Sequence, residues 1–190
     1  MRYFLVAGEA SGDLHASALI RALRAEDPEA SFAFMGGDKM EAAAGVSPIV
    51  HYREVAFMGI VSVVKNLGKL TRIGRQIQAA MRDFAPDVVI PVDYADFNFR
   101  FILPYAKKEL RCPVIYYILP KLWAWRAGRI RQLRRYVDLG LSILPFETSY
   151  FSDRGLRTEY IGNPCVDAKL TYLAEHPEPV EREQMLLLVP

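Results

Sequence analysis

Two carboxylates that could take part in proton transfer follow apolar runs in the sequence. Glu9 comes just after residues 2–7, and Asp93 ends residues 88–92, which have the cleanest strand pattern in the chain. A carboxylate that is partly removed from water is a credible general base for a sugar hydroxyl group. The sequence therefore predicts Asp93 as a base and Glu9 as a second functional carboxylate.

A glycine loop, residues 8–13, joins the first apolar run to a helical pattern that begins at Leu14. Its G-x-x-x-G spacing differs from the G-x-G-x-x-G of dinucleotide-binding loops. Its two acids would repel a pyrophosphate, so the loop favours contacts with hydroxyl groups through Ser11, Gly12 and Asp13. The alternative is that Ser11 caps the following helix and Asp13 complements its dipole.

An aromatic and basic segment follows a later predicted strand. From Lys121 to Arg135 there are six lysines and arginines and no acid. Trp123 and Trp125 stand beside Arg126, a combination that suits a phosphorylated and partly apolar ligand, because guanidinium groups bind phosphate and indole rings pack on sugar or lipid. The alternative is that the two tryptophans anchor a helix in the core.

Asp96 and Asn98 follow Asp93 closely in the chain. Asp96 is expected either to cap the helix predicted at residues 99–110 or to contribute to the same site. An Asp-x-x-Asp pattern could also suggest a metal ion, but no third ligand of another type accompanies it, so no metal site is predicted. His51 has no evident partner and is expected to be structural.

The composition excludes several classes of protein. The chain is 52% hydrophobic and 24% charged, with a net charge of +2, and it has no nucleic-acid recognition motif, so no nucleic-acid partner is expected. No run reaches the ~18 apolar residues of a membrane span, and the sequence shows no signal-peptide pattern. Cys112 and Cys165 lie far apart and are expected to be reduced, buried thiols of a cytoplasmic protein.

Alternating strand and helix patterns predict an α/β fold with a Rossmann-like, doubly wound parallel sheet. Ligands of such sheets bind at the carboxyl ends of the strands, so the three groups of candidate residues are expected to meet at one edge. Strands are predicted at residues 2–7, 31–35, 48–52, 88–92, 113–118, 137–144, 158–161 and 184–190. Helices are predicted at residues 14–26, 38–44, 60–84, 99–110, 127–135, 146–152 and 166–175.

The longest helical pattern, residues 60–84, combines an apolar stripe with a basic face and has no acid before Asp83. One interpretation is a core helix with a solvated basic face. The other is a membrane-surface segment whose apolar residues enter lipid while its basic residues meet anionic head groups. The residues assigned to the membrane are Phe57, Met58, Ile60, Val63, Lys65, Lys69 and Arg72.

A proline-containing linker precedes the last apolar run of the sequence. That run would open a new strand–helix unit, because an isolated apolar strand would leave an unpaired edge. We therefore expect residues 1–176 to form one domain, and residues 177–190 to be a linker and the first strand of a truncated second domain.

Several motifs together resemble the N-terminal half of the lipid-A-disaccharide synthase family, in order and spacing, over essentially the whole chain. They are Val6-Ala-Gly-Glu-Ala-Ser-Gly-Asp13, Met58-Gly-Ile-Val61, Pro86-Asp-Val88, Asp93 with Asp96-Phe-Asn98, Trp123-Ala-Trp-Arg126 and Leu144-Pro-Phe-Glu147. The first and fifth are specific, since neither is a general signature of the fold.

The resemblance implies the N-terminal, acceptor-binding domain of a GT-B glycosyltransferase that is inverting and needs no metal or cofactor. The family moves 2,3-diacylglucosamine from UDP to the 6-hydroxyl of 2,3-diacylglucosamine 1-phosphate (lipid X). The products are the β-1,6 disaccharide of lipid A and UDP. The resemblance makes Asp93 the general base and Glu9 essential. It assigns to acceptor binding Ser11, Gly12, Asp13, Asp96, Asn98, Trp123, Trp125 and Arg126.

The resemblance also implies a peripheral location on the inner face of the cytoplasmic membrane, and it allows a homodimer of the full-length form. We expect the 190-residue chain alone to be inactive, because the family binds most of UDP with a second domain. The alternatives are another GT-B enzyme that acts on a UDP-sugar and a non-catalytic module that binds a membrane surface.

Overall fold

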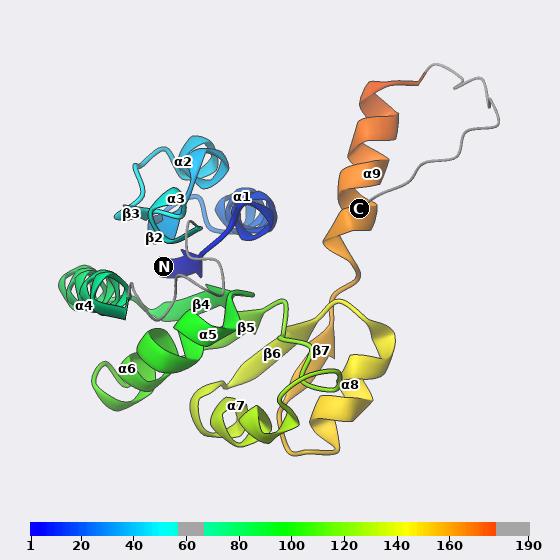
Figure 1. The fold of residues 1–190 in the computed structure, drawn as a ribbon. Helices are drawn as coiled ribbons and strands as arrows, with labels where there is room; N and C mark the ends of the chain where they lie inside the picture. Colours follow the sequence, from blue (N-terminus) through cyan, green and yellow to red (C-terminus); the bar gives the residue numbers. More distant parts are fainter. Residues whose placement is uncertain (57–66, 178–190) are drawn as a thin grey trace.

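Within the residues that the computed structural model describes, 1–56 and 67–177, seven parallel strands form one sheet in the order β3-β2-β1-β4-β5-β6-β7 (Figure 1). The doubly wound parallel sheet expected from the sequence is confirmed. The strands are β1 (Arg2–Ala7), β2 (Ser31–Gly36), β3 (Val50–His51), β4 (Val88–Val92), β5 (Ile115–Tyr117), β6 (Leu139–Ser142) and β7 (Thr158–Tyr160).

Helices cover both faces of the sheet, α1 and α2 on one side and α4, α6, α7 and α8 on the other (Figure 1). The helices are α1 (Ala10–Glu26), α2 (Asp38–Ala44), α3 (Arg53–Ala56), α4 (Leu67–Phe84), α5 (Ala95–Phe97), α6 (Leu103–Lys108), α7 (Ile130–Tyr136), α8 (Pro145–Ser152) and α9 (Pro164–Glu175). A π-helical stretch, Asn98–Ile102, joins α5 to α6, and a short 3-10 turn, Ala127–Arg129, precedes α7.

The central strand β1 supplies side chains to two hydrophobic cores. Phe4 and Val6 pack in the core under α4, α6, α7 and α8, whereas Leu5 and Ala7 pack in the core under α1 and α2. Successive side chains of a strand point to opposite faces, so a run that is apolar throughout suits a strand buried on both sides. This buried centre holds the carboxyl ends of β1 and β4 side by side, since Ala7 pairs with Val92.

Some predicted boundaries were wrong. The first helix begins at Ala10 and not at Leu14, so most of the glycine loop is helical. The strand expected at residues 137–144 spans only Leu139–Ser142. The single helix expected at residues 99–110 is two short pieces, the π-helical stretch and α6, and α5 precedes them directly.

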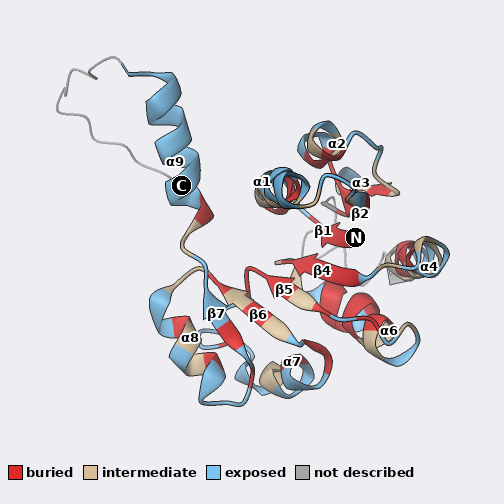
Figure 2. Cartoon of the chain, turned by 180° about the vertical axis from the view of Figure 1, so that it is seen from behind, coloured by how far each residue is buried: buried red, intermediate tan, exposed pale blue. Residues whose placement is uncertain are grey.

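Helix α9 stands away from the rest of the domain (Figures 1 and 2). Every residue of α9 after Pro164 is exposed, including the large apolar side chains Val166, Leu170 and Leu173. Cys112 is buried as expected, but Cys165 is exposed at the start of α9, so that expectation was wrong. The strand predicted at residues 184–190 lies outside the described residues.

Candidate active site at the carboxyl edge of the sheet

Asp93 occupies a strained turn directly after β4. Its φ angle is 43° and that of Tyr94 is 45°, so two successive non-glycine residues adopt the left-handed conformation. This conformation costs about 1–2 kcal/mol per residue for L-amino acids. Strain of this kind persists only where the surrounding structure imposes it, and it gathers at functional sites.

The carboxyl group of Asp93 is half-buried, and its surroundings change its pKa. Desolvation raises the pKa of Asp93, and the negative charge of Glu9 raises it further. A hydrogen bond from the Tyr94 backbone and the charge of Lys121 act in the opposite direction without cancelling the rise. A carboxylate with a raised pKa is a stronger proton acceptor than an exposed aspartate, as the predicted role of Asp93 requires.

Glu9 lies at the same edge, at the N-cap position of α1, where its side chain makes no capping hydrogen bond. Instead, one of its carboxylate oxygens accepts a hydrogen bond of 3.0 Å from the Ser11 hydroxyl. Ser11 is therefore not the cap that the sequence left as an alternative. Both side chains are exposed at the edge and can meet a ligand hydroxyl.

Gly8 allows the loop after β1 to approach the Asp93 turn. A Cβ atom on Gly8 would lie only 2.0 Å from Cδ1 of Tyr94, so any side chain there would displace the Tyr94 ring. Gly12, by contrast, is buried against β1, where an added Cβ would lie 3.2 Å from the Cβ of Ala7. Gly12 therefore allows α1 to pack closely on β1, and its predicted contact with a substrate stays a prediction.

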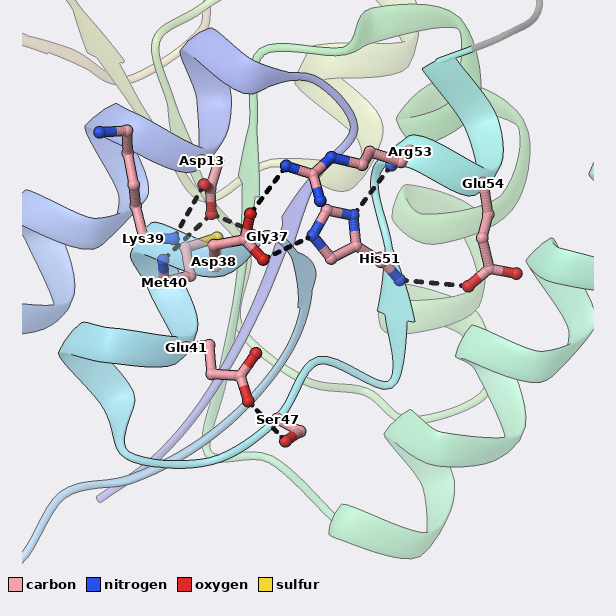
Figure 3. Close-up of polar contacts among 10 residues, drawn as sticks. All are labelled: Asp13, Gly37, Asp38, Lys39, Met40, Glu41, Ser47, His51, Arg53 and Glu54. Carbon is pink, nitrogen blue, oxygen red and sulfur yellow. Dashed lines mark hydrogen bonds and ion pairs between the residues drawn. The ribbon is translucent and has the colours of Figure 1, made fainter.

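Asp13 has a structural role that the sequence did not reveal (Figure 3). Its carboxylate is buried and accepts hydrogen bonds from the backbone N–H groups of Gly37 (2.8 Å), Lys39 (3.1 Å) and Met40 (3.1 Å). It thus caps α2, whose own N-cap residue, Gly37, has no side chain to do so. Because these contacts occupy its carboxylate, Asp13 is not retained as a substrate-binding residue.

A second polar cluster lies at the ends of β2 and β3 (Figure 3). Nε2 of His51 lies 3.2 Å from Oδ1 of Asp38, and the Arg53 guanidinium donates to Oδ2 of Asp38 over 2.9 Å. Nδ1 of His51 accepts a hydrogen bond of 3.1 Å from the Arg53 backbone. The expectation that His51 has no partner was wrong. The cluster joins β3 to α2, and its three residues do not line the cavity beside Asp93.

A cavity of about 320 Å³ opens beside Asp93. It carries one carboxylate against three basic side chains, of which Lys121 and Arg129 were not predicted as site residues. Its lining residues are Asp93, Ala95, Ile118, Leu119, Pro120, Lys121, Leu122, Trp125, Arg126 and Arg129. A polar floor at Asp93 with cationic and apolar walls suits a ligand that has a hydroxyl, a phosphate and an apolar part.

Asp96 joins α5 to the cationic wall of the cavity. Its Oδ1 accepts a hydrogen bond of 2.7 Å from Arg126 and another from Arg129. Partial desolvation acts to raise the pKa of Asp96, but these two guanidinium groups outweigh it and lower the pKa. The N-cap position of α5 is Tyr94, so Asp96 is not the helix cap that the sequence allowed.

The two tryptophans are not core anchors, because both are substantially exposed. Trp125 is 70% exposed and lines the cavity, with the Arg126 guanidinium 5.6 Å from its ring centroid. Trp123 is 42% exposed, and its Nε1 donates a hydrogen bond of 3.0 Å to Glu147. Glu147 is buried, and its second oxygen has no hydrogen-bond partner within the described part of the chain. The hydrogen bond to Glu147 therefore fixes the position of the Trp123 indole ring.

Asn98 was predicted to bind a substrate, but it is fully buried and does not line the cavity. Its side-chain amide donates to the main-chain carbonyl of Asp93 over 2.7 Å. Asn98 therefore contacts the Asp93 turn from the buried side, through the main chain of Asp93. The sequence could not predict this hydrogen bond between Asn98 and Asp93, because it forms only when the chain is folded.

Some of the residues assigned to the membrane lie outside the part of the chain that the structure describes. Phe57, Met58, Ile60, Val63 and Lys65 lie outside the described residues, whereas Lys69 and Arg72 are exposed on α4. The opposite side of α4 is buried in the core, through Ile73, Ile77 and Met81. The described part of α4 is thus a core helix with a solvated basic face.

The structure describes residues 1–56 and 67–177, and two features are absent from these ranges. In these ranges, no three histidine, cysteine, aspartate or glutamate side chains gather closely enough to hold a metal ion. No helix in the same ranges has the length and apolar character that crossing a membrane requires.

Comparison with known proteins adds sequence relatives. A family model described as "Lipid-A-disaccharide synthetase" matches residues 3–185. The lipid-A-disaccharide synthase of Myxococcus xanthus is 44% identical over 166 residues, which are 87% of this chain and 43% of that protein. The lipid-A-disaccharide synthase of Trichlorobacter lovleyi is 37% identical, with the same coverage. The chain therefore spans less than half the length of these relatives.

Solved structures share the fold at low sequence identity. UDP-GlcNAc 2-epimerase from Neisseria meningitidis, bound to UDP-GlcNAc, superposes with a TM-score of 0.67 and 14% identity, over 93% of this chain and 50% of the epimerase chain. S. aureus MnaA, in a co-structure with UDP, gives a TM-score of 0.65 and 14% identity, over 94% of this chain and 48% of its own. At these identities the likeness concerns the fold alone.

Proposed function

We propose a function from the premise that this chain belongs to the lipid-A-disaccharide synthetase family. The chain forms the acceptor-binding part of an inverting hexosyltransferase, which acts together with a donor-binding domain in the remaining length found in its relatives. The reaction moves 2,3-diacylglucosamine from UDP to the 6-hydroxyl of lipid X and releases UDP. The observation that carries the proposal is the desolvated Asp93 carboxylate on the floor of a cavity with a cationic wall.

Asp93 acts as the general base of the transfer. Its carboxylate accepts the proton of the 6-hydroxyl as the hydroxyl oxygen forms a bond to the anomeric carbon of the donor. The bond between that carbon and the UDP oxygen breaks, and UDP leaves with the electron pair. Attack from the face opposite UDP inverts the anomeric centre. The step needs no redox partner, and we expect no cofactor.

The cationic wall recognises the phosphate of lipid X. Arg126 and Arg129 are already held side by side by Asp96, and Lys121 lies on the same cavity. Guanidinium groups in fixed positions bind phosphate oxygens in pairs. Trp125 offers an exposed ring for the sugar or an acyl chain. Glu9, supported by Ser11, meets a further hydroxyl at the edge.

The substrates carry acyl chains, so the enzyme works peripherally on the inner face of the cytoplasmic membrane. The exposed cations Lys69 and Arg72 of α4 support this placement, because anionic lipid surfaces attract basic side chains. They follow the apolar stretch Phe57–Val63 in the sequence. The proposed membrane-facing set therefore combines this stretch of the sequence with the two cations of α4.

The test is the transfer reaction itself. UDP-2,3-diacylglucosamine and radiolabelled lipid X are incubated with the 190-residue chain and, separately, with a longer form that includes the remaining length of its relatives. We expect the longer form to produce radiolabelled disaccharide and UDP, and the 190-residue chain to produce neither. A folded longer form that makes no disaccharide would overturn the substrate assignment. Isomerisation of a UDP-sugar would instead indicate an epimerase.

A further inference from the structure

The main-chain carbonyl of Asp93 receives two hydrogen bonds from buried side chains. The Tyr116 hydroxyl donates to it over 2.6 Å, and the Asn98 amide donates over 2.7 Å. Both side chains are fully buried, and neither lines the cavity. The N–H group of Asp93 donates to the carbonyl of Tyr117 over 3.1 Å. Both polar main-chain groups of Asp93 are thus fixed.

These contacts explain how the turn keeps its conformation. Asp93 and Tyr94 both have positive φ angles, which non-glycine residues usually leave when nothing constrains them. Asn98 also donates its backbone N–H to the carbonyl of Tyr94, over 3.3 Å. Asn98 is the first residue of the π-helical stretch, a type of irregular helix often found at functional sites. One residue therefore contacts both members of the strained turn.

Asn98 is a poor choice for stability alone. Its side-chain oxygen is buried and has no hydrogen-bond partner within the described ranges. Burying an unpaired polar atom is unfavourable, whereas an apolar side chain of the same size would avoid this penalty. The side-chain amide nitrogen of Asn98 donates to the main-chain carbonyl of Asp93. The use of asparagine at this position is therefore best explained by its effect on the turn.

We propose that Asn98 and Tyr116 are positioning residues that hold the Asp93 carboxylate in the cavity through the main-chain carbonyl of Asp93. The inference rests on the proposed function, in which Asp93 is the base. Without these donors the turn relaxes, and the carboxylate moves toward solvent. It then loses its fixed place among the charged groups around it, which are Glu9 after β1, Asp96 in α5, and Lys121, Arg126 and Arg129 after β5.

The first test measures the Asp93 carboxyl group directly in the 190-residue chain. Carbon-13 NMR follows its titration in the unsubstituted chain and in Tyr116→Phe and Asn98→Leu, each of which removes one donor and leaves the other. Burial is the largest cause that raises the pKa of Asp93, so we expect both variants to shift the titration midpoint toward the ordinary aspartate value. Tyr3→Phe removes a hydroxyl from a buried tyrosine at the opposite end of β1 and should not shift it.

Lower melting temperatures with an unchanged Asp93 titration in both variants would overturn the proposal, because a purely structural role would give that result. This outcome does not depend on transferase activity. It can therefore be separated from a failure of the proposed function, which would appear as undiminished turnover in Asp93→Asn.

The second test uses the longer form in the transfer assay. Misplacement of a reacting group by about 1 Å can lower turnover on the order of 100-fold, so we expect Tyr116→Phe and Asn98→Leu to lower kcat on the order of 10- to 100-fold. The KM for lipid X should stay within about two-fold, since the binding groups are untouched. The acidic limb of the pH profile should move to lower pH. An unchanged kcat in both variants would contradict the positioning role.

Discussion

Asp93 combines two properties that oppose folding, a strained backbone and a desolvated carboxylate. Its pKa is raised mainly by burial and then by Glu9, so the folded protein holds the Asp93 proton more tightly than the unfolded chain does. The stabilisation that this gives is fully present below the unfolded pKa of about 3.9 and is lost as pH rises through the higher folded value. At neutral pH the ionised group is therefore a liability for stability.

Asp93→Asn should accordingly make the protein more stable at neutral pH. We expect a gain within the range of about 0.5–2 kcal/mol that a single stabilising substitution commonly yields. Because the gain comes from removing an ionised group, it should shrink as pH falls toward about 4. Urea unfolding at pH 7 and pH 4 measures both values. A variant that is less stable than the unsubstituted chain at pH 7 would contradict this account.

Asp13 illustrates the opposite case, a carboxylate retained for structure. Asp13→Ala should lower the free energy of unfolding by about 1–3 kcal/mol, because it leaves buried backbone donors of α2 without an acceptor. Asp83→Ala is a matched control, since Asp83 is exposed and such surface changes usually stay within about 0.5 kcal/mol. Equal effects of the two substitutions in chemical denaturation would refute the capping role.

At the scale of elements, the segment between β5 and α7 forms the cationic wall of the cavity. Arg126→Lys keeps the charge but loses the paired donors that fit a phosphate. In the longer form we expect the KM for lipid X to rise on the order of 10-fold, with kcat little changed. Arg131→Lys on the exposed surface of α7 is the control, because Arg131 does not line the cavity. With an acceptor that lacks the phosphate, the KM values of Arg126→Lys and Arg131→Lys should be the same.

Helix α4 has a buried apolar side and an exposed basic side. Lys69→Glu with Arg72→Glu should weaken binding to anionic vesicles, since each basic residue near the surface contributes about 1 kcal/mol, or roughly 30-fold for the pair. Arg21→Glu with Lys39→Glu is the matched control on the opposite helical layer. Cosedimentation with vesicles that contain phosphatidylglycerol measures the difference. Equal binding by both double variants would remove α4 from the membrane-facing surface.

Over the whole molecule, the strands and helices that follow a hydrophobic pattern were predictable from the sequence. The roles of side chains that depend on single tertiary contacts were not. The apolar run of β4 and the charge that follows it placed Asp93 at the edge of the sheet. The role of Asp13 could not be read from the sequence, because its partners in α2 follow 24 or more residues later. Trp123 was identified, but its buried partner Glu147 comes from another element.

The difference between sequence patterns and tertiary contacts also explains the wrong helix boundaries. It explains why Lys121 and Arg129 were not predicted to line the cavity. Hydrophobic periodicity does not detect a π-helical stretch, which keeps an apolar face while its hydrogen bonds change. Lys121 and Arg129 belong to the basic segment that the sequence indicated, but nothing in the sequence distinguishes them from its other cations. They become site residues only because the turn after β5 brings them to the cavity beside Asp93.

The most direct measurement is turnover of Asp93→Asn in the longer form, with UDP-2,3-diacylglucosamine and lipid X. Asparagine keeps the size of the side chain and tolerates the left-handed turn, but it cannot accept the hydroxyl proton. We predict that kcat falls on the order of 100- to 10,000-fold while binding of lipid X is retained. Turnover equal to that of the unsubstituted enzyme would show that Asp93 is not the base and would contradict the account.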